Sequence, residues 1–194
     1  MNHLQDIHAK YHTTNFGFWI YLLSDIMLFG AFFATFMVLR ENTAGGVSAQ
    51  DVFQLPYVLL QTIVLLVSSF TAAIALLAAR FGKYRDMRRY LIATLLLGLT
   101  FLGLELFEFI TMYLEGHSWQ ESAFLSSFFA LVGLHGAHIA AGLIWLGVFL
   151  YYLRERAMDE HMMRKLGLFV LFWHFLDLVW IWIFIIVYLF GVSL

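Results

Sequence analysis

Five long stretches of apolar residues, separated by short polar segments, dominate the chain. Each stretch has at least the roughly 20 residues that a helix needs to cross the hydrocarbon core of a bilayer. The stretches cover about residues 17–39, 57–79, 90–113, 124–152 and 166–190. The pattern therefore predicts an all-α polytopic membrane protein, in which a bundle of five transmembrane helices forms one membrane domain over residues 1–194.

The composition agrees with lipid as the solvent of this chain. Of its 194 residues, 62% are hydrophobic and only 12% are charged. The polar segment before the first stretch lacks the basic start and cleavage site of a secretory signal, so we expect the first helix to be retained. A net charge of -2 offers no basic face to nucleic acid, and the absence of cysteine excludes disulfides, iron–sulfur clusters and thiolate copper sites.

The basic residues divide unevenly between the two ends of the predicted bundle. Ten of the 11 Lys and Arg residues lie before the first helix, between the second and third, or between the fourth and fifth. Only Arg40 falls at the other end. Because short loops rich in Lys and Arg stay in the cytoplasm, we expect a cytoplasmic N-terminus and a C-terminus on the outside.

Two further patterns concern the surfaces of the helices. Aromatic residues near the span ends are expected to anchor at the lipid headgroups. These residues are Tyr57, Tyr113, Trp119, Tyr151, Tyr152 and Tyr188.

Small residues four positions apart are expected on helix faces that contact protein. They are Gly30 with Ala34, Ser68 with Ala72, Ser69 with Ala73, and the series Gly133, Ala137 and Ala141.

Ionisable residues inside the predicted spans are the candidates for a functional site. They are Asp25, Glu105, Glu108, His135, His138, His174 and Asp177. A charged carboxylate at the bilayer centre costs about 3 kcal/mol, so these groups should face the bundle, pair with one another or hold a proton. Six of the seven form pairs three residues apart, which places the two members of each pair on one side of a helix.

Three interpretations of these residues compete. A haem held by two histidines requires both ligands at nearly the same depth, whereas the three imidazoles lie roughly 12, 20 and 24 Å from the cytoplasmic helix ends. A di-iron site requires a Glu-x-x-His motif on each of two helices, and none occurs. A proton or ion path would use the same residue types, but five spans do not divide into inverted repeats. In the third interpretation, the groups bond one another, a lipid or a neighbouring subunit and fix the helix packing.

Four segments that contain these residues resemble subunit III of the haem–copper oxidases, in the same order and spacing. They are GFWIYLLSD at 17–25, FLGLELFEF at 101–109, FFALVGLHGAH at 128–138 and FWHFLDLVW at 172–180. The loop sequence NTAGG at 42–46, followed by FQLP at 53–56, is similar to the quinol-oxidising branch of that family. The resemblance extends over essentially the whole chain from Phe16.

The resemblance implies an accessory, non-catalytic subunit of a proton-pumping terminal oxidase in the bacterial inner membrane, which passes electrons from ubiquinol to oxygen. The haems and copper would lie on subunit I, and the partners would be subunits I, II and IV together with phospholipid. This chain would carry no cofactor, metal or catalytic residue. The alternatives are a subunit III of a menaquinol or cytochrome c oxidase and, from another class, a small stand-alone proton-coupled transporter.

The wider family has seven spans, with a lipid-filled cleft between the first two and the others. The five spans of this chain match the last five. At the position of Asp25 the family places a carboxylate, usually Glu, in a helix next to subunit I.

Overall fold

The structure is a computed structural model, and it describes residues 2–47, 53–155 and 158–193. Its helices are α1 (Asn2–Leu39), α3 (Leu55–Arg80), α4 (Tyr84–Leu114), α5 (Ala123–Glu155) and α6 (Glu160–Ile183). After α6 the chain continues as a π-helical segment, η1 (Phe184–Leu189), and a last turn, α7 (Phe190–Ser193). No strand occurs in the described ranges.

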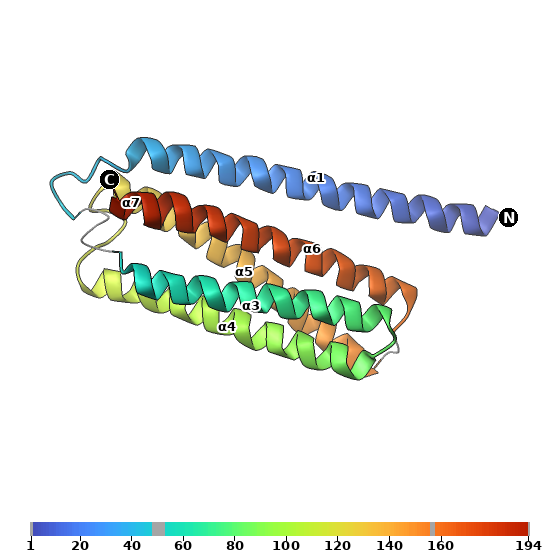
Figure 1. Cartoon of the computed structure of the whole chain (residues 1–194). Coiled ribbons are helices and arrows are strands. Elements are labelled where there is room, and N and C mark those ends of the chain that lie inside the picture. The colour runs from blue at the N-terminus through green and yellow to red at the C-terminus, as the bar shows by residue number, and fades with distance from the viewer. Residues whose placement is uncertain (1, 48–52, 156–157, 194) are drawn as a thin grey trace.

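In the part of the chain that the structure describes, five helices are long and apolar enough to cross a membrane, as the sequence predicts. The spanning portions are Asn15–Leu39, Leu55–Arg80, Tyr84–Leu114, Ala123–Arg154 and Glu160–Leu189. The N- and C-termini lie at opposite ends of the bundle (Figure 1). We call the end of the bundle that holds the C-terminus the C-terminal end. The loops that join α1 to α3 and α4 to α5 lie there as well (Figure 1).

Local sequence explains several helix ends. Pro56 stands in the first turn of α3, where a residue without an N–H loses no hydrogen bond. Gly82, with φ of 72°, follows α3 in the left-handed conformation that glycine adopts most readily. Asp159 caps α6, because its Oδ1 accepts a 2.7 Å hydrogen bond from the backbone N–H of Met162.

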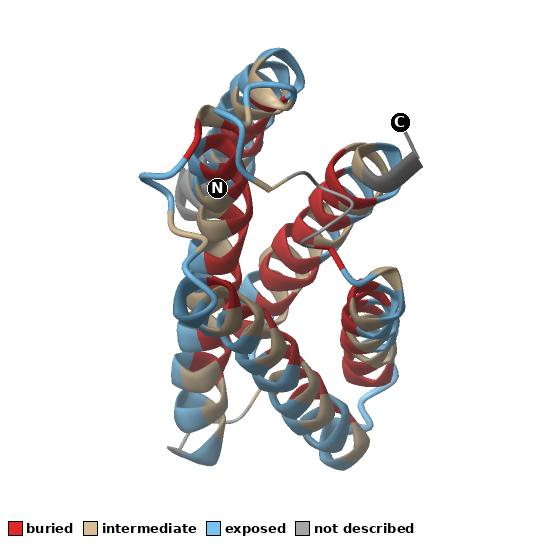
Figure 2. Ribbon diagram, turned by 90° about the vertical axis from the view of Figure 1, so that its left-hand side faces the viewer, coloured by how far each residue is buried: buried red, intermediate tan, exposed pale blue. Residues whose placement is uncertain are grey.

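The helices are not packed equally. α3 packs on α4 and α6, α5 packs on α4 and α6, and α1 contacts chiefly α5 with a smaller contact to α6. Viewed along the bundle from the C-terminal end, the buried positions lie on the sides where helices face one another (Figure 2). α1 therefore depends on fewer contacts than the other four spanning helices.

Trp173 is a central packing element of the core. Its indole N–H donates a 2.9 Å hydrogen bond to Ser68 Oγ on α3. A methyl group added at Gly98 or Gly142 would lie 3.0 or 2.9 Å from the indole ring, so α4 and α5 approach it where neither carries a side chain. Close packing of this kind replaces the hydrophobic effect as the main force between helices in lipid.

The prediction about small residues is correct for α3 and wrong for α5 within this chain. Ser68 and Ala72 are buried, whereas Ala137 and Ala141 are exposed. α5 turns a different side toward its neighbours, with Ile139 fully buried. On α1, Gly30 and Ala34 are likewise exposed.

Candidate functional site

Asp25 and His138 meet at the contact between α1 and α5. The Oδ2 atom of Asp25 lies 3.6 Å from Nε2 of His138, and both side chains are largely buried. The other ring nitrogen, Nδ1, lies 2.8 Å from the carbonyl oxygen of Leu134. A carbonyl only accepts, so Nδ1 carries a proton and donates it.

The 3.6 Å separation between Asp25 Oδ2 and His138 Nε2 is longer than a hydrogen bond, and Asp25 Oδ2 has no hydrogen-bond partner among the described residues. The two side chains therefore form a close polar contact inside the predicted spans, where each reduces the exposure of the other to apolar surroundings. Phe29 covers the His138 ring, with the ring centres 5.2 Å apart. The pair is thus a shielded polar contact that joins α1 to α5.

Glu105 lies deep in the core between α4 and α5. Its side chain is 1% exposed, and neither carboxyl oxygen has a hydrogen-bond partner among the described residues. The carboxyl group packs against the backbone of Gly136, where a methyl group would approach Oε2 to 2.8 Å. Gly136 therefore provides the space that the Glu105 carboxyl occupies.

His135 lies in the aromatic core. Its ring lies 5.2 Å from the Trp180 ring and 5.9 Å from the Phe101 ring, with no exposed surface. Neither ring nitrogen has a partner among the described residues. Trp180 is itself fixed by a 3.0 Å hydrogen bond from its indole N–H to Thr62 Oγ1.

Glu108 faces α3 and η1. Its Oε2 accepts a 3.0 Å hydrogen bond from Gln61 Nε2 and a 3.5 Å hydrogen bond from the Tyr188 hydroxyl. Tyr57 is nearby and donates to the carbonyl oxygen of Leu104 at 2.7 Å. The structure thus brings Glu108 together with an amide and a phenol from two other elements, and no hydrogen bond joins it to Glu105.

His174 and Asp177 have different surroundings, although they are one turn apart on α6. His174 is exposed and lines a groove of about 260 Å³ between α1 and α6, with Trp19 and Ile26 on the other wall. Asp177 lies near Ser69 of α3, and its Oδ1 is buried without a hydrogen bond from a described residue. No hydrogen bond joins the two side chains.

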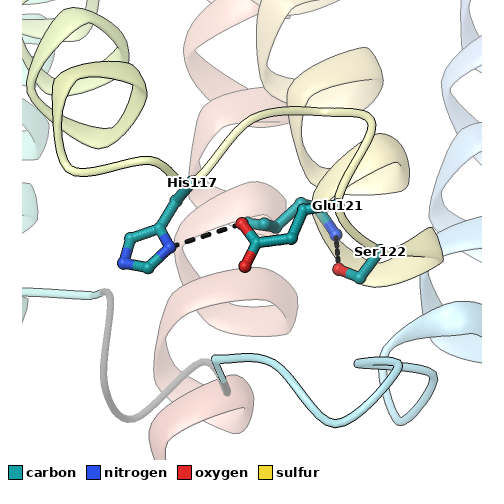
Figure 3. A network of polar contacts seen from close by, with 4 residues as sticks. His117, Glu121 and Ser122 are labelled. Carbon is teal, nitrogen blue, oxygen red and sulfur yellow. Dashed lines mark hydrogen bonds and ion pairs between the residues drawn. The ribbon is translucent and has the colours of Figure 1, made fainter.

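A further polar group lies outside the spans, in the loop between α4 and α5. His117 Nδ1 is 3.4 Å from Glu121 Oε2, and the Ser122 hydroxyl accepts a hydrogen bond from Leu125 N–H at the start of α5 (Figure 3). The backbone N–H of Phe124 donates to the Asn42 carbonyl at 3.3 Å. This hydrogen bond joins the segment after α1 to the start of α5, a contact that the sequence did not predict.

Of the seven predicted site residues, only Asp25 and His138 contact each other directly. Sequence reasoning missed Gln61, which is completely buried and could have been found by searching the spans for uncharged polar residues. The prediction that Tyr188 is a headgroup anchor is wrong: this side chain is completely buried and its hydroxyl bonds Glu108. Within the described ranges, no three His, Asp or Glu side chains are grouped closely enough to hold a metal ion.

Comparisons with known proteins cover nearly the whole chain. The sequence profile of the family described as "Cytochrome c oxidase subunit III" matches residues 3–192. The chain is 45% identical over 199 residues to "Cytochrome bo(3) ubiquinol oxidase subunit 3" of Pseudomonas aeruginosa, an alignment that covers 97% of this chain and 95% of the relative.

Two relatives from Bacillus are also similar. "Quinol oxidase subunit 3" of Bacillus subtilis is 44% identical over 177 residues, which cover 91% of this chain and 87% of the relative. "Cytochrome c oxidase subunit 3" of Bacillus sp. strain PS3 is 41% identical over 175 residues, which cover 90% and 84%. The five spanning helices, the profile match and these identities agree, and the chain belongs to the cytochrome c oxidase subunit III family.

Proposed function

We propose that the chain is the accessory subunit III of a proton-pumping terminal oxidase that passes electrons from ubiquinol to oxygen. The observation that supports this most is the 45% identity, over 97% of the chain, to a relative named as a ubiquinol oxidase subunit 3. In this proposal the chain assembles with subunits I, II and IV in the bacterial inner membrane. The haems and copper lie on subunit I, and no residue of this chain takes part in the redox chemistry.

The electron donor needs its own test, because relatives named after different donors resemble this chain almost equally. The subunits named after quinol are 43–45% identical in Pseudomonas and Bacillus subtilis, and the subunit named after cytochrome c is 41% identical. We expect the purified complex to reduce oxygen with ubiquinol and to show no turnover with reduced cytochrome c. Turnover with cytochrome c alone would overturn the proposed donor.

The proposed structural role follows from how α1 is held. α1 contacts chiefly α5, and the pair of Asp25 with His138 is a polar contact within that interface. Exposed apolar side chains such as Met27 and Val38, each 76% exposed, leave much of α1 for lipid or for another subunit. In this proposal the pair keeps α1 in the position that the catalytic subunit requires.

The experiment that tests assembly is purification of the tagged chain from membranes in a mild detergent. We expect it to copurify with a haem-containing partner in a fixed ratio. A chain that purifies alone and without haem would support the stand-alone transporter. Metal analysis of the separated chain should find no stoichiometric iron, copper or zinc, and His135→Ala should leave the haem absorption spectrum of the complex unchanged.

A further inference from the structure

A small polar cavity opens between α3 and α4 at the C-terminal end of the bundle. Its volume is about 80 Å³. Polar groups supplied by both helices line it: Gln54, Tyr57, Glu108, Thr111 and Glu115. Glu108 lies within α4 and Glu115 follows the last residue of that helix, so two carboxyl groups about two turns apart line the cavity. The cavity therefore offers acceptors for a positively charged group.

The hydrogen bonds of Glu108 leave one of its oxygens for this cavity. Gln61 and Tyr188, which do not line the cavity, both donate to Oε2, and neither donates to Oε1. These bonds hold the carboxyl group in place while it lines the cavity wall. A carboxylate fixed by donors on one side and open on the other is a preorganised acceptor.

Among the described residues, no Lys, Arg or His lines the cavity. The sequence has no Lys or Arg between Arg40 and Arg80, or between Arg89 and Arg154. The histidine nearest in sequence, His117, lies 3.4 Å from Glu121 in the following loop. A positively charged group in the cavity would therefore come from another molecule.

The depth of the cavity favours a lipid headgroup. α4 has 31 residues, a length of about 46 Å against about 30 Å for the hydrocarbon core. The last charged residue of α4 before its apolar stretch is Arg89. A helix needs roughly 20 residues to cross the hydrocarbon core, and that many residues counted from Arg89 end next to Glu108. The cavity thus runs from the edge of the hydrocarbon core into the headgroup layer. Phe107, which also lines it, is 63% exposed and offers apolar surface to an acyl chain.

We infer that this cavity binds the ammonium group of a phospholipid with an ethanolamine headgroup, in the leaflet at the C-terminal end of the bundle. The ammonium group donates to Glu108 Oε1 and to acceptors nearer the rim, and the acyl chains lie along α4 over Phe107. A primary ammonium has three N–H donors, and each methyl group that replaces a hydrogen removes one of them. The site therefore distinguishes ethanolamine from choline headgroups.

The test uses the assembled complex, stripped of lipid and studied by native mass spectrometry while dioleoylphosphatidylethanolamine or dioleoylphosphatidylcholine is titrated. We expect the ethanolamine lipid to bind more tightly than the choline lipid. Glu108→Gln keeps the size of the side chain but loses its charge, and should weaken the ethanolamine lipid about tenfold, the scale of one charge-assisted hydrogen bond. Glu41→Gln is the matched control, because Glu41 is an exposed carboxylate at the same end and lies 3.6 Å from Arg40.

Each contrary result would overturn the inference. If the parent complex binds both lipids with equal affinity, the lipid is held by apolar contacts alone and the ammonium group is not recognised. An unchanged affinity of the ethanolamine lipid for Glu108→Gln would show that the lipid binds elsewhere. If the parent complex does not bind the lipid and a lysine of another subunit fills the cavity, the cavity is a contact site between subunits. Release of one divalent cation by a chelator would make it a metal site. If Glu108→Gln assembles poorly, Glu115→Gln at the rim gives the same comparison. Copurification and quinol turnover are measured separately, so this inference and the proposed function fail independently.

Discussion

Gly136 permits a direct test of how tightly the buried carboxyl group of Glu105 is held. Gly136→Ala would place a methyl carbon 2.8 Å from Oε2 and 2.9 Å from Oε1 of Glu105. Both distances are shorter than an ordinary van der Waals contact, which begins at 3.4 Å. Glu105 is 1% exposed and has little room to move. Overpacking of this kind costs about 1–3 kcal/mol, against a gain of up to about 1 kcal/mol in helix propensity when Ala replaces Gly.

Gly133 gives a matched control on the same helix. A methyl group there would meet only Phe109, at 3.7 Å, so Gly133→Ala should be neutral or stabilising. The assay heats the assembled complex in steps and measures how much of this chain remains per haem. At about 2–4 °C per kcal/mol for a chain of this size, Gly136→Ala should lower the midpoint of loss by several degrees relative to Gly133→Ala.

Glu105→Ala completes a double-mutant cycle. If the clash with the carboxyl group causes the loss, Gly136→Ala should cost much less in a Glu105→Ala background, with a coupling free energy of about 1–3 kcal/mol. Equal midpoints for Gly136→Ala and Gly133→Ala would refute the close approach. If Gly136→Ala costs as much stability in the Glu105→Ala background as in the parent, the methyl group clashes with a group other than the Glu105 carboxyl.

Three other predictions address orientation, the polar contact of α1 and the core. Alkaline phosphatase fused after Leu194 should be active on the outer side of the membrane, and alkaline phosphatase fused after Arg85 should be inactive; the reverse pattern would reject a cytoplasmic N-terminus. His138→Leu should cost about 1–3 kcal/mol in retention of the chain, because it leaves the Asp25 carboxyl group unpaired, whereas His138→Gln keeps a donor and should be milder; equal losses would argue against the pair. Trp173→Phe and Ser68→Ala should each lose about 1 kcal/mol of stability, and the two losses should not add in the double variant; additivity would rule out their hydrogen bond.

The number and type of the helices could be predicted from the sequence because the length of an apolar stretch is a direct physical requirement for crossing a bilayer. The helix ends were less predictable. α1 begins at Asn2, not near Gly17, and α4 at Tyr84, not Tyr90. In both cases a polar segment continues the helix beyond the apolar stretch. Hydrophobicity indicates which residues contact lipid, whereas helical backbone hydrogen bonds form in polar segments as well.

The partners of the polar residues could not be predicted, because they depend on how each helix is rotated. Residues three apart differ by about 300° around the helix axis, which leaves roughly 60° between them. That angle is enough to send Glu105 toward α5 and Glu108 toward α3. The same spacing on α5 directs His138 to Asp25 and His135 to Trp180. Spacing identifies a shared side, but packing determines which neighbour each side chain meets.

The π-helical segment near the end of the chain makes the length of the sequence itself part of the fold. A π turn holds more residues than an α turn, and Val187 and Tyr188, adjacent in sequence, are both completely buried there. The π turns of Phe184–Leu189 take up one extra residue, so deletion of a single residue here would allow a regular α-helix while the following side chains keep nearly the same side of the helix. If the segment became a regular α-helix without that deletion, Tyr188 and the residues after it would rotate, and the Tyr188 hydroxyl would turn away from Glu108. A relative with one residue fewer in this segment can therefore keep the same contacts with a regular α-helix, and relatives should be compared for their residue count here as carefully as for residue identity.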